Sequence, residues 1–296
     1  MHKISIKETN NSSIIKFESN EFLVKNQSFE FSNIDEAKPS PLAQQLFYLP
    51  FVKKVYISGN FVAIEKFNIV EWPDVAEEVA LQIDNYLNSG KPIVISEQNS
   101  RKVPVTIYAE STPNPSVMKF VANKKISLKP FEYNNIDETG NSPLAKRLFN
   151  LPFVKSIFID ENFVSVAKYN VAEWQEITLE LREMIRTFIE DGGDVVLPDM
   201  ENNSAEKENY SSAETSDETS MQIISILDEY VKPAVASDGG NIIFKSYNSG
   251  NKTVELILQG ACSGCPSSTL TLKNGIETML REMLNGKVEN VVAYNG

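Results

Sequence analysis

The chain has 296 residues, a net charge of −12 and a hydrophobic content of 42%. This length predicts two or three soluble domains, because domains usually hold roughly 100–150 residues. The negative charge argues against a nucleic-acid-binding protein and against an electrostatic membrane anchor, because both need Lys and Arg at the contact surface. No apolar run reaches the ~20 residues of a membrane span, and the first residues resemble neither a secretory signal nor an organelle-targeting segment. We therefore expect a cytoplasmic protein without nucleic-acid or membrane partners.

The first two thirds of the chain contain an internal duplication. Residues 29–72 align without gaps to residues 131–174, and 25 of these 44 positions are identical. The offset of 102 residues is far longer than the period of a solenoid repeat, so it indicates a duplicated domain. We expect the first repeat to cover residues 1–100 and the second repeat to cover residues 101–196.

Each repeat has the pattern of a ββαββα domain. Alternating polar and apolar residues predict strands, whereas apolar residues at every fourth position predict a helix. Ser40 followed by Pro41 is a typical helix start, because Ser caps free amides and Pro fits the first helical turn. The second repeat gives the same order and ends with a helix over about 174–190. The predicted elements of the first repeat are strands near 13–18 and 22–31, a helix from Pro41 to before Leu49, a hairpin of 52–57 and 60–66, and a helix over about 70–87.

Residues 197–220 differ in composition from both repeats. Seven acidic residues stand there against one Lys, which gives −6, half of the net charge of the chain. Such a segment cannot bury enough apolar surface to offset the entropy of ordering. We expect an acidic, flexible linker.

The last part of the chain, residues 221–296, predicts a small αββαβ domain. Its first helix is expected to kink or stop near Pro233, because proline removes a backbone donor. The whole chain is then of the α+β class, with two tandem ββαββα domains followed by the linker and this domain. The later elements are strands over 242–247 and 253–258, a helix over about 267–284 and a strand over 288–294.

Cys262 and Cys265 are the only cysteines, and they lie in a Gly-Ala-Cys-Ser-Gly-Cys-Pro segment between a predicted strand and a predicted helix. The partial positive charge of a helix N-terminus lowers the pKa of a nearby thiol, so we expect both to be reactive or metal-binding. In a reducing compartment, this spacing more often serves metal binding or redox chemistry than structure. A third interpretation is a pair of buried structural cysteines, but a loop at a helix start is poorly placed for burial, so we expect both side chains to be accessible.

One chain offers only half of a soft-metal site. Structural zinc sites and iron–sulfur clusters usually take four protein ligands. His2, the only histidine, is at the N-terminus and is expected to be solvated. A symmetric dimer would supply four thiolates at its two-fold axis, and such a shared site is typical of a carrier. The alternative is a thiol–disulfide oxidoreductase, which needs a single pair, although no thioredoxin-like βαβ pattern precedes it.

Residues 260–277 resemble the signature of the NifU C-terminal (Nfu-type) domain, and Pro233-Ala234 with Asp238-Gly239-Gly240 resembles its upstream segment. Ser111-Thr112-Pro113-Asn114-Pro115-Ser116 resembles the opening of the Nfu N-terminal domain. The first repeat keeps only Thr9-Asn10-Asn11-Ser12 there, without the prolines.

This resemblance implies an iron–sulfur cluster scaffold or carrier that is not an enzyme. Cys262 and Cys265 would bind an iron–sulfur cluster, [4Fe–4S] by the resemblance, between two protomers of a homodimer. The cluster would come from an upstream donor and pass to apo-proteins. Four thiolates suit [2Fe–2S] equally well, so the cluster type rests on the resemblance alone. We assign the two repeats, as a hypothesis, to docking of partner proteins.

Overall fold

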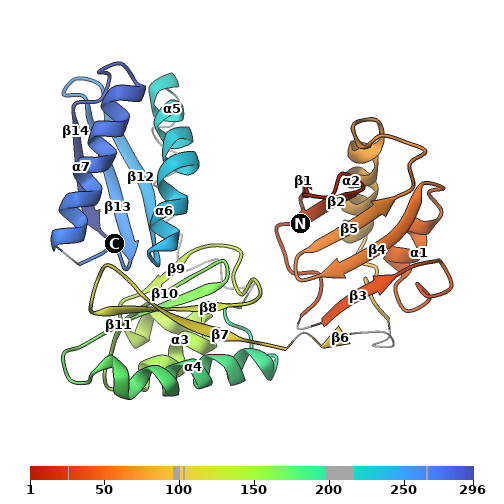
Figure 1. Ribbon diagram of the computed structural model, residues 1–296, viewed down its shortest axis with the longest axis horizontal. Coiled ribbons are helices and arrows are strands. Elements are labelled where there is room, and N and C mark those ends of the chain that lie inside the picture. Colours follow the sequence, from red (N-terminus) through yellow and green to blue (C-terminus); the bar gives the residue numbers. More distant parts are fainter. Residues whose placement is uncertain (26, 96–100, 103, 198–216, 265) are drawn as a thin grey trace. The chain divides into compact units, whose positions relative to one another are not determined.

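The computed structural model describes residues 1–25, 27–95, 101–102, 104–197, 217–264 and 266–296, and it forms two compact units, Met1–Pro104 and Val105–Gly296 (Figure 1). The first unit holds the first repeat. The second unit holds the second repeat and the C-terminal domain. Residues 198–216 of the expected linker lie outside the described residues, and helix α5 begins before the expected linker ends.

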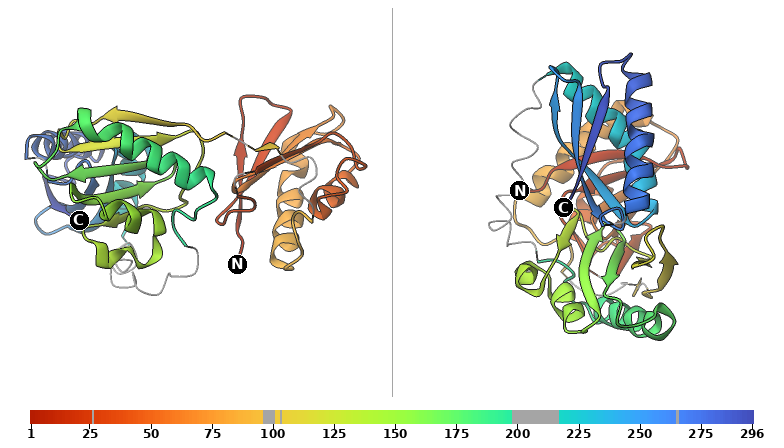
Figure 2. Two further views of the ribbon diagram at one scale, coloured as in Figure 1. Left: turned by 90° about the horizontal axis from the view of Figure 1, so that it is seen from below. Right: turned by 90° about the vertical axis from the view of Figure 1, so that its left-hand side faces the viewer.

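The first unit is a six-stranded antiparallel sheet with two helices on one face (Figures 1 and 2). The strand order is β1-β2-β5-β4-β3-β6, so the hairpin of β4 and β5 lies at the centre. The α+β class is confirmed, and the two edge strands, β1 and β6, add to the predicted pattern. The elements are β1 (Ile4–Glu8), β2 (Ile14–Ser19), β3 (Gln27–Phe31), α1 (Pro41–Phe47), β4 (Val52–Ser58), β5 (Phe61–Lys66), α2 (Trp72–Asn88) and β6 (Arg101–Lys102).

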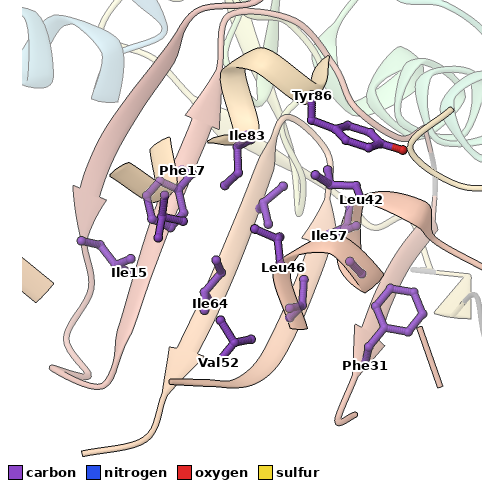
Figure 3. Close-up of a cluster of buried hydrophobic side chains, with 14 of the residues drawn as sticks. Ile15, Phe17, Phe31, Leu42, Leu46, Val52, Ile57, Ile64, Ile83 and Tyr86 are labelled. Atoms are coloured by element: carbon purple, nitrogen blue, oxygen red, sulfur yellow. The ribbon is translucent and has the colours of Figure 1, made fainter. Parts of the chain in front are cut away.

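The core of this unit lies between the sheet and its two helices (Figure 3). Strands β2, β4 and β5 each point every second side chain into this core. Fully buried examples are Phe17, Ile57 and Ile64, and Ile83 of α2 packs with them. Trp72 is 8% exposed, and its ring meets Phe17 edge-on at 6.4 Å between centroids. Trp72 therefore anchors the first turn of α2 in the core of this unit.

The short helix in each repeat begins at a serine cap, as predicted. Ser40 Oγ accepts a 3.2 Å hydrogen bond from the Ala43 amide, and Ser142 Oγ accepts one of 3.1 Å from Ala145. Each cap hydroxyl also donates, at 2.7 Å, to a carbonyl 53 residues further along the chain. One side chain therefore starts the helix and fastens the segment that follows the long helix.

The second repeat has the same architecture, with strand order β7-β8-β11-β10-β9 and α3 and α4 on one face of the sheet (Figure 1). Trp174 begins α4 and is half-buried, so it anchors that helix less deeply than Trp72 anchors α2. The elements are β7 (Ile107–Ser111), β8 (Val117–Ala122), β9 (Phe131–Tyr133), a 3₁₀ helix (Ile136–Asn141), α3 (Pro143–Phe149), β10 (Val154–Asp160), β11 (Phe163–Lys168) and α4 (Trp174–Glu190).

The C-terminal domain has the predicted αββαβ order, with three strands and one buried sheet face. Its first helix changes to a π-helical turn just before Pro233, because proline cannot supply the regular helical amide. Strand β14 runs parallel to β13. None of the described helices is long and apolar enough to cross a membrane. The elements are α5 (Glu218–Ile226), the π turn (Leu227–Val231), α6 (Lys232–Ser237), β12 (Gly240–Asn248), β13 (Thr253–Gly260), α7 (Pro266–Met283) and β14 (Asn290–Asn295).

Candidate cysteine site

Cys262 lies in the loop between β13 and α7, where the sequence places it. The two flanking glycines, Gly260 and Gly264, have φ of +62° and +77°, a backbone conformation that residues with a Cβ rarely adopt. The loop is fastened at both ends. The Ser263 amide donates to the Gly260 carbonyl at 3.1 Å, and the Thr269 hydroxyl of α7 donates to the Cys262 carbonyl at 3.3 Å.

The side chain of Cys262 lies in the core of the C-terminal domain, and the residue is 7% exposed. The expectation that this loop keeps its cysteines accessible is therefore wrong for Cys262. The side chain packs with the apolar side chains between the sheet and the helices. Gly240 at the start of β12 makes this possible, because a Cβ there would lie 2.7 Å from Cys262 Sγ and 2.6 Å from the Gln259 carbonyl oxygen. The strand and the thiol therefore approach closely only while residue 240 is glycine.

Burial decides the protonation of Cys262 in this arrangement. It raises the pKa of the thiol to about 12, and the nearby carboxylate of Asp238 adds to the rise. The expected lowering of its pKa by the helix N-terminus is thus wrong for Cys262, because desolvation of the thiolate outweighs the helix dipole. A metal-binding thiolate forms here only when the loop gains access to solvent or when a metal replaces the proton.

Cys265 lies outside the described residues, so the structure does not place it relative to Cys262. In the part of the chain that is described, no group of three or more His, Cys, Asp or Glu side chains could hold a metal ion. His2 is not solvated, contrary to expectation. Its side chain is 19% exposed, and Nδ1 lies 2.9 Å from the Ser19 hydroxyl.

The second repeat covers the cysteine loop with the sheet face that its helices leave open. The side-chain amide of Asn114 donates to the carbonyl oxygens of Ala261 and Ser263, at 3.2 and 3.3 Å. These two residues flank Cys262. Glu132 Oε1 accepts a 2.9 Å hydrogen bond from the Gly260 amide.

A second loop of the C-terminal domain is held by the same face. Ser165 Oγ donates to the Gly239 carbonyl at 2.6 Å, and Lys119 Nζ donates to the Ser237 carbonyl at 3.0 Å. Phe158 is 1% exposed and lies so close to Gly260 that a Cβ at that glycine would approach the ring to 2.8 Å. The recognised groups are mostly backbone groups.

The amino-acid sequence does not predict this contact. Asn114 belongs to the Thr-Pro-Asn-Pro motif that carried the resemblance to the Nfu N-terminal domain, and that motif is the one sequence signal that points to it. Its turn is positioned by Trp174, whose Nε1 donates to the Pro115 carbonyl at 2.9 Å.

A shallow groove of about 340 Å³ lies on the C-terminal domain beside the cysteine loop, between α7 and β14. Gly264 forms its end nearest the loop, and Leu270, which is 59% exposed, lines its side. An apolar side chain of this size next to the loop is a candidate contact for a partner molecule.

Comparison with known proteins covers all three domains. Residues 4–90 and 107–192 each match the family model described as scaffold protein Nfu/NifU N terminal, and residues 223–292 match that of the NifU-like domain.

Two curated relatives carry the name "NFU1 iron-sulfur cluster scaffold homolog, mitochondrial". The protein from Drosophila willistoni is 37% identical over 177 residues, which is 59% of each chain. The protein from Drosophila erecta is 38% identical over 177 residues, 59% of this chain and 60% of its own. The chain therefore matches less than two thirds of the length of these relatives.

Among solved structures, a NifU-like protein from Saccharomyces cerevisiae is 26% identical, over 31% of this chain and 84% of its own. Its TM-score of 0.29 is too low to establish a shared overall fold.

Proposed function

Because the chain belongs to the Nfu/NifU family of iron–sulfur cluster scaffold proteins, we propose that it holds a [4Fe–4S] cluster between two molecules and transfers it to apo-proteins. Cys262 and Cys265 of each molecule supply the four thiolates. The proposal rests mainly on the position of Cys262. This residue lies in a loop with two glycines in the left-handed conformation, directly before the N-terminus of α7. A helix N-terminus carries free amides and a partial positive charge, so it suits an anionic cluster once the thiol becomes accessible.

Two features support a shared site. Two cysteines per chain are half of the usual ligand set, so a second molecule has to complete it. Leu270 and the groove beside the cysteine loop offer apolar surface for that molecule. A cluster held this way is released when the two molecules separate, as a carrier requires. We propose that the protein itself catalyses no reaction.

Family membership favours this function over a thiol–disulfide oxidoreductase, because the matching family models and the named relatives are scaffold proteins. Cys262 is only 7% exposed, so its thiol has to become accessible for either function. We propose that an upstream donor protein supplies the cluster and that apo-proteins accept it. The cytoplasmic location remains a prediction.

Anaerobic reconstitution with iron and sulfide tests the proposal. We expect a brown dimer with about four irons per dimer. Cys262→Ser and Cys265→Ser should each abolish the cluster absorbance, whereas the matched control Ser263→Ala, between the two cysteines, should keep it. A cluster that survives Cys262→Ser would overturn the ligand assignment. A colourless monomer that reduces insulin disulfides would favour the oxidoreductase.

A further inference from the structure

In each repeat, one face of the sheet lies on the side away from the helices of that repeat, and the two faces carry matching residues. Lys16 on β2 and Lys119 on β8 occupy equivalent positions, opposite Ala63 and Ser165 in the same strand register. In both repeats the lysine ammonium lies over a phenylalanine ring of the neighbouring strand. The distance to the ring centroid is 4.1 Å for Lys16 and 4.8 Å for Lys119. The face is therefore duplicated together with the fold.

In the second repeat this face is occupied by the C-terminal domain. Four polar side chains of this face contact two loops of that domain, residues 237–240 and 260–263. Three of them donate to carbonyl oxygens: Asn114, Lys119 and Ser165. The fourth, Glu132, accepts a hydrogen bond from a backbone amide in the second loop. The side chain of Lys119 is only 10% exposed as a result.

In the first repeat three of these four polar residues recur as Asn11, Lys16 and Glu30. The side chains of Lys16 and Glu30 are 32% and 31% exposed, so both remain accessible on this face. Tyr56 stands where the second repeat has Phe158, and Ala63 stands where it has Ser165. One hydrogen-bonding hydroxyl is lost and the aromatic surface is kept.

We propose that the open face of the first repeat, formed by Asn11, Lys16, Glu30, Tyr56 and Phe61, binds the C-terminal domain of a second molecule of this chain. The contact is made to the loops 237–240 and 260–263. The occupant follows from the duplication, because the matching face of the second repeat already holds this domain through the same residue types.

The exchange replaces most of the contacts that it breaks. A C-terminal domain that leaves the second repeat of its own molecule loses hydrogen bonds to backbone groups, and the first repeat of another molecule offers three of the four side chains that make them. Exchange of one element between identical chains is a low-cost route to association.

The first repeat should bind more weakly and with more salt sensitivity. Its face carries Lys54, which lies 3.0 Å from Glu30, where the second repeat has Ser156. Lys16 likewise lies 3.3 Å from Glu18, where the second repeat has Val121. These ion pairs have to rearrange when the face is occupied, and salt screens the charges involved.

The first test is self-association of the full-length apo-protein by analytical ultracentrifugation. Ser165→Lys should displace the C-terminal domain from its own second repeat and tighten self-association by about tenfold or more, because the competing internal contact is removed. Adding Lys16→Glu should return the protein to a monomer, whereas the control Lys91→Glu, an exposed charge after α2, should leave the dimer. A monomeric Ser165→Lys variant, or a dimer that persists with Lys16→Glu, overturns the proposal.

A second test needs no substitution at the docking contact of the second repeat. The photocrosslinking residue benzoylphenylalanine replaces Tyr56 in the full-length chain. Equal amounts of ¹⁵N-labelled and unlabelled protein are mixed and irradiated. We expect crosslinks from one isotopic chain to residues 237–240 or 260–263 of the other. Crosslinks confined to one chain, or none to these loops, overturn it. Because the protein is free of cluster throughout, this outcome is independent of cluster binding.

Discussion

The side-chain amide of Asn114 lies 3.2 Å from the carbonyl oxygen of Ala261, the residue directly before Cys262. The two residues are 147 positions apart, and the contact joins the second repeat to the cysteine loop. This hydrogen bond places the Thr-Pro-Asn-Pro motif of the second repeat against the loop that contains Cys262. Access to Cys262 should therefore depend on residues of the second repeat.

Asn114→Ala should expose Cys262 more often. A hydrogen bond of this kind contributes about 0.5–1.5 kcal/mol, so its loss should raise the open population and the thiol reaction rate by about two- to tenfold. The measurement is the rate of iodoacetamide labelling in a Cys265→Ser background, read by mass spectrometry of the peptide containing Cys262. Asn68→Ala, at an exposed position of the first repeat outside the proposed docking face, is the control. Equal rates in both variants would contradict a covering role for Asn114.

Gly240→Ala should damage the cysteine site. Its Cβ would meet Cys262 Sγ at 2.7 Å and the Gln259 carbonyl at 2.6 Å, so β12 has to move away from β13. We expect a loss of stability of about 1–3 kcal/mol, typical of overpacking, measured by urea unfolding. Gly275→Ala is the matched control, because nothing lies within 4 Å of its added Cβ on α7, and it should stabilise that helix by up to about 1 kcal/mol. Equal effects at both glycines would contradict the close approach.

The duplication made most of the fold predictable. Each strand that contributes alternate side chains to a core was found, because burial imposes a period of two, and Ser40 and Ser142 gave the helix starts. The edge strands β1 and β7 were missed for the opposite reason. Four of the five residues of each are exposed, so their pairing with β2 and β8 buries little apolar surface and leaves only a short, weak pattern in the sequence.

The contact over the cysteine loop could not be predicted in the same way. Lys119, Glu132 and Ser165 are polar residues on the outer face of strands, and such residues usually face water. Their partners are main-chain groups, which have no sequence signature. The local sequence also predicts the wrong direction for the pKa of Cys262. It shows the helix N-terminus, which lowers a thiol pKa, but not the burial by the fold, which raises it.

Asp160 should make the second unit less stable as the pH rises. Burial raises the pKa of this carboxyl to about 6 from 3.8. A raised pKa in the folded state favours the protonated form, so the stabilisation is present below about pH 4 and is lost as the pH rises through about 6. Asp160→Asn removes the buried charge. It should raise the free energy of unfolding near neutral pH by about 1–2 kcal/mol, after allowance for partial exposure, and change it little near pH 4.

Thermal unfolding of both proteins across this pH range measures the effect of Asp160. The difference in Tm should grow between about pH 4 and pH 7 and then level off. A difference that is constant with pH would show that the substitution acts through packing and not through the charge.

The two tryptophans should respond differently to the same substitution. Trp174 Nε1 donates to the Pro115 carbonyl and so holds the turn that carries Asn114, whereas the buried Nε1 of Trp72 has no hydrogen-bond partner among the residues that the structure describes. Trp174→Phe therefore loses a hydrogen bond of about 1 kcal/mol, while Trp72→Phe removes an unpaired donor and offsets part of the lost packing. Each variant leaves one tryptophan, so fluorescence of Trp72→Phe follows the second unit alone and that of Trp174→Phe follows the first.

For Trp174→Phe we expect faster labelling of Cys262 as well, because the turn around Asn114 is released. The labelling rate in Trp72→Phe should stay at the wild-type value, since Trp72 packs only within the core of the first repeat. If both variants label at the wild-type rate, the hydrogen bond of Trp174 does not position Asn114, and the closed loop depends on Lys119, Glu132 and Ser165 instead.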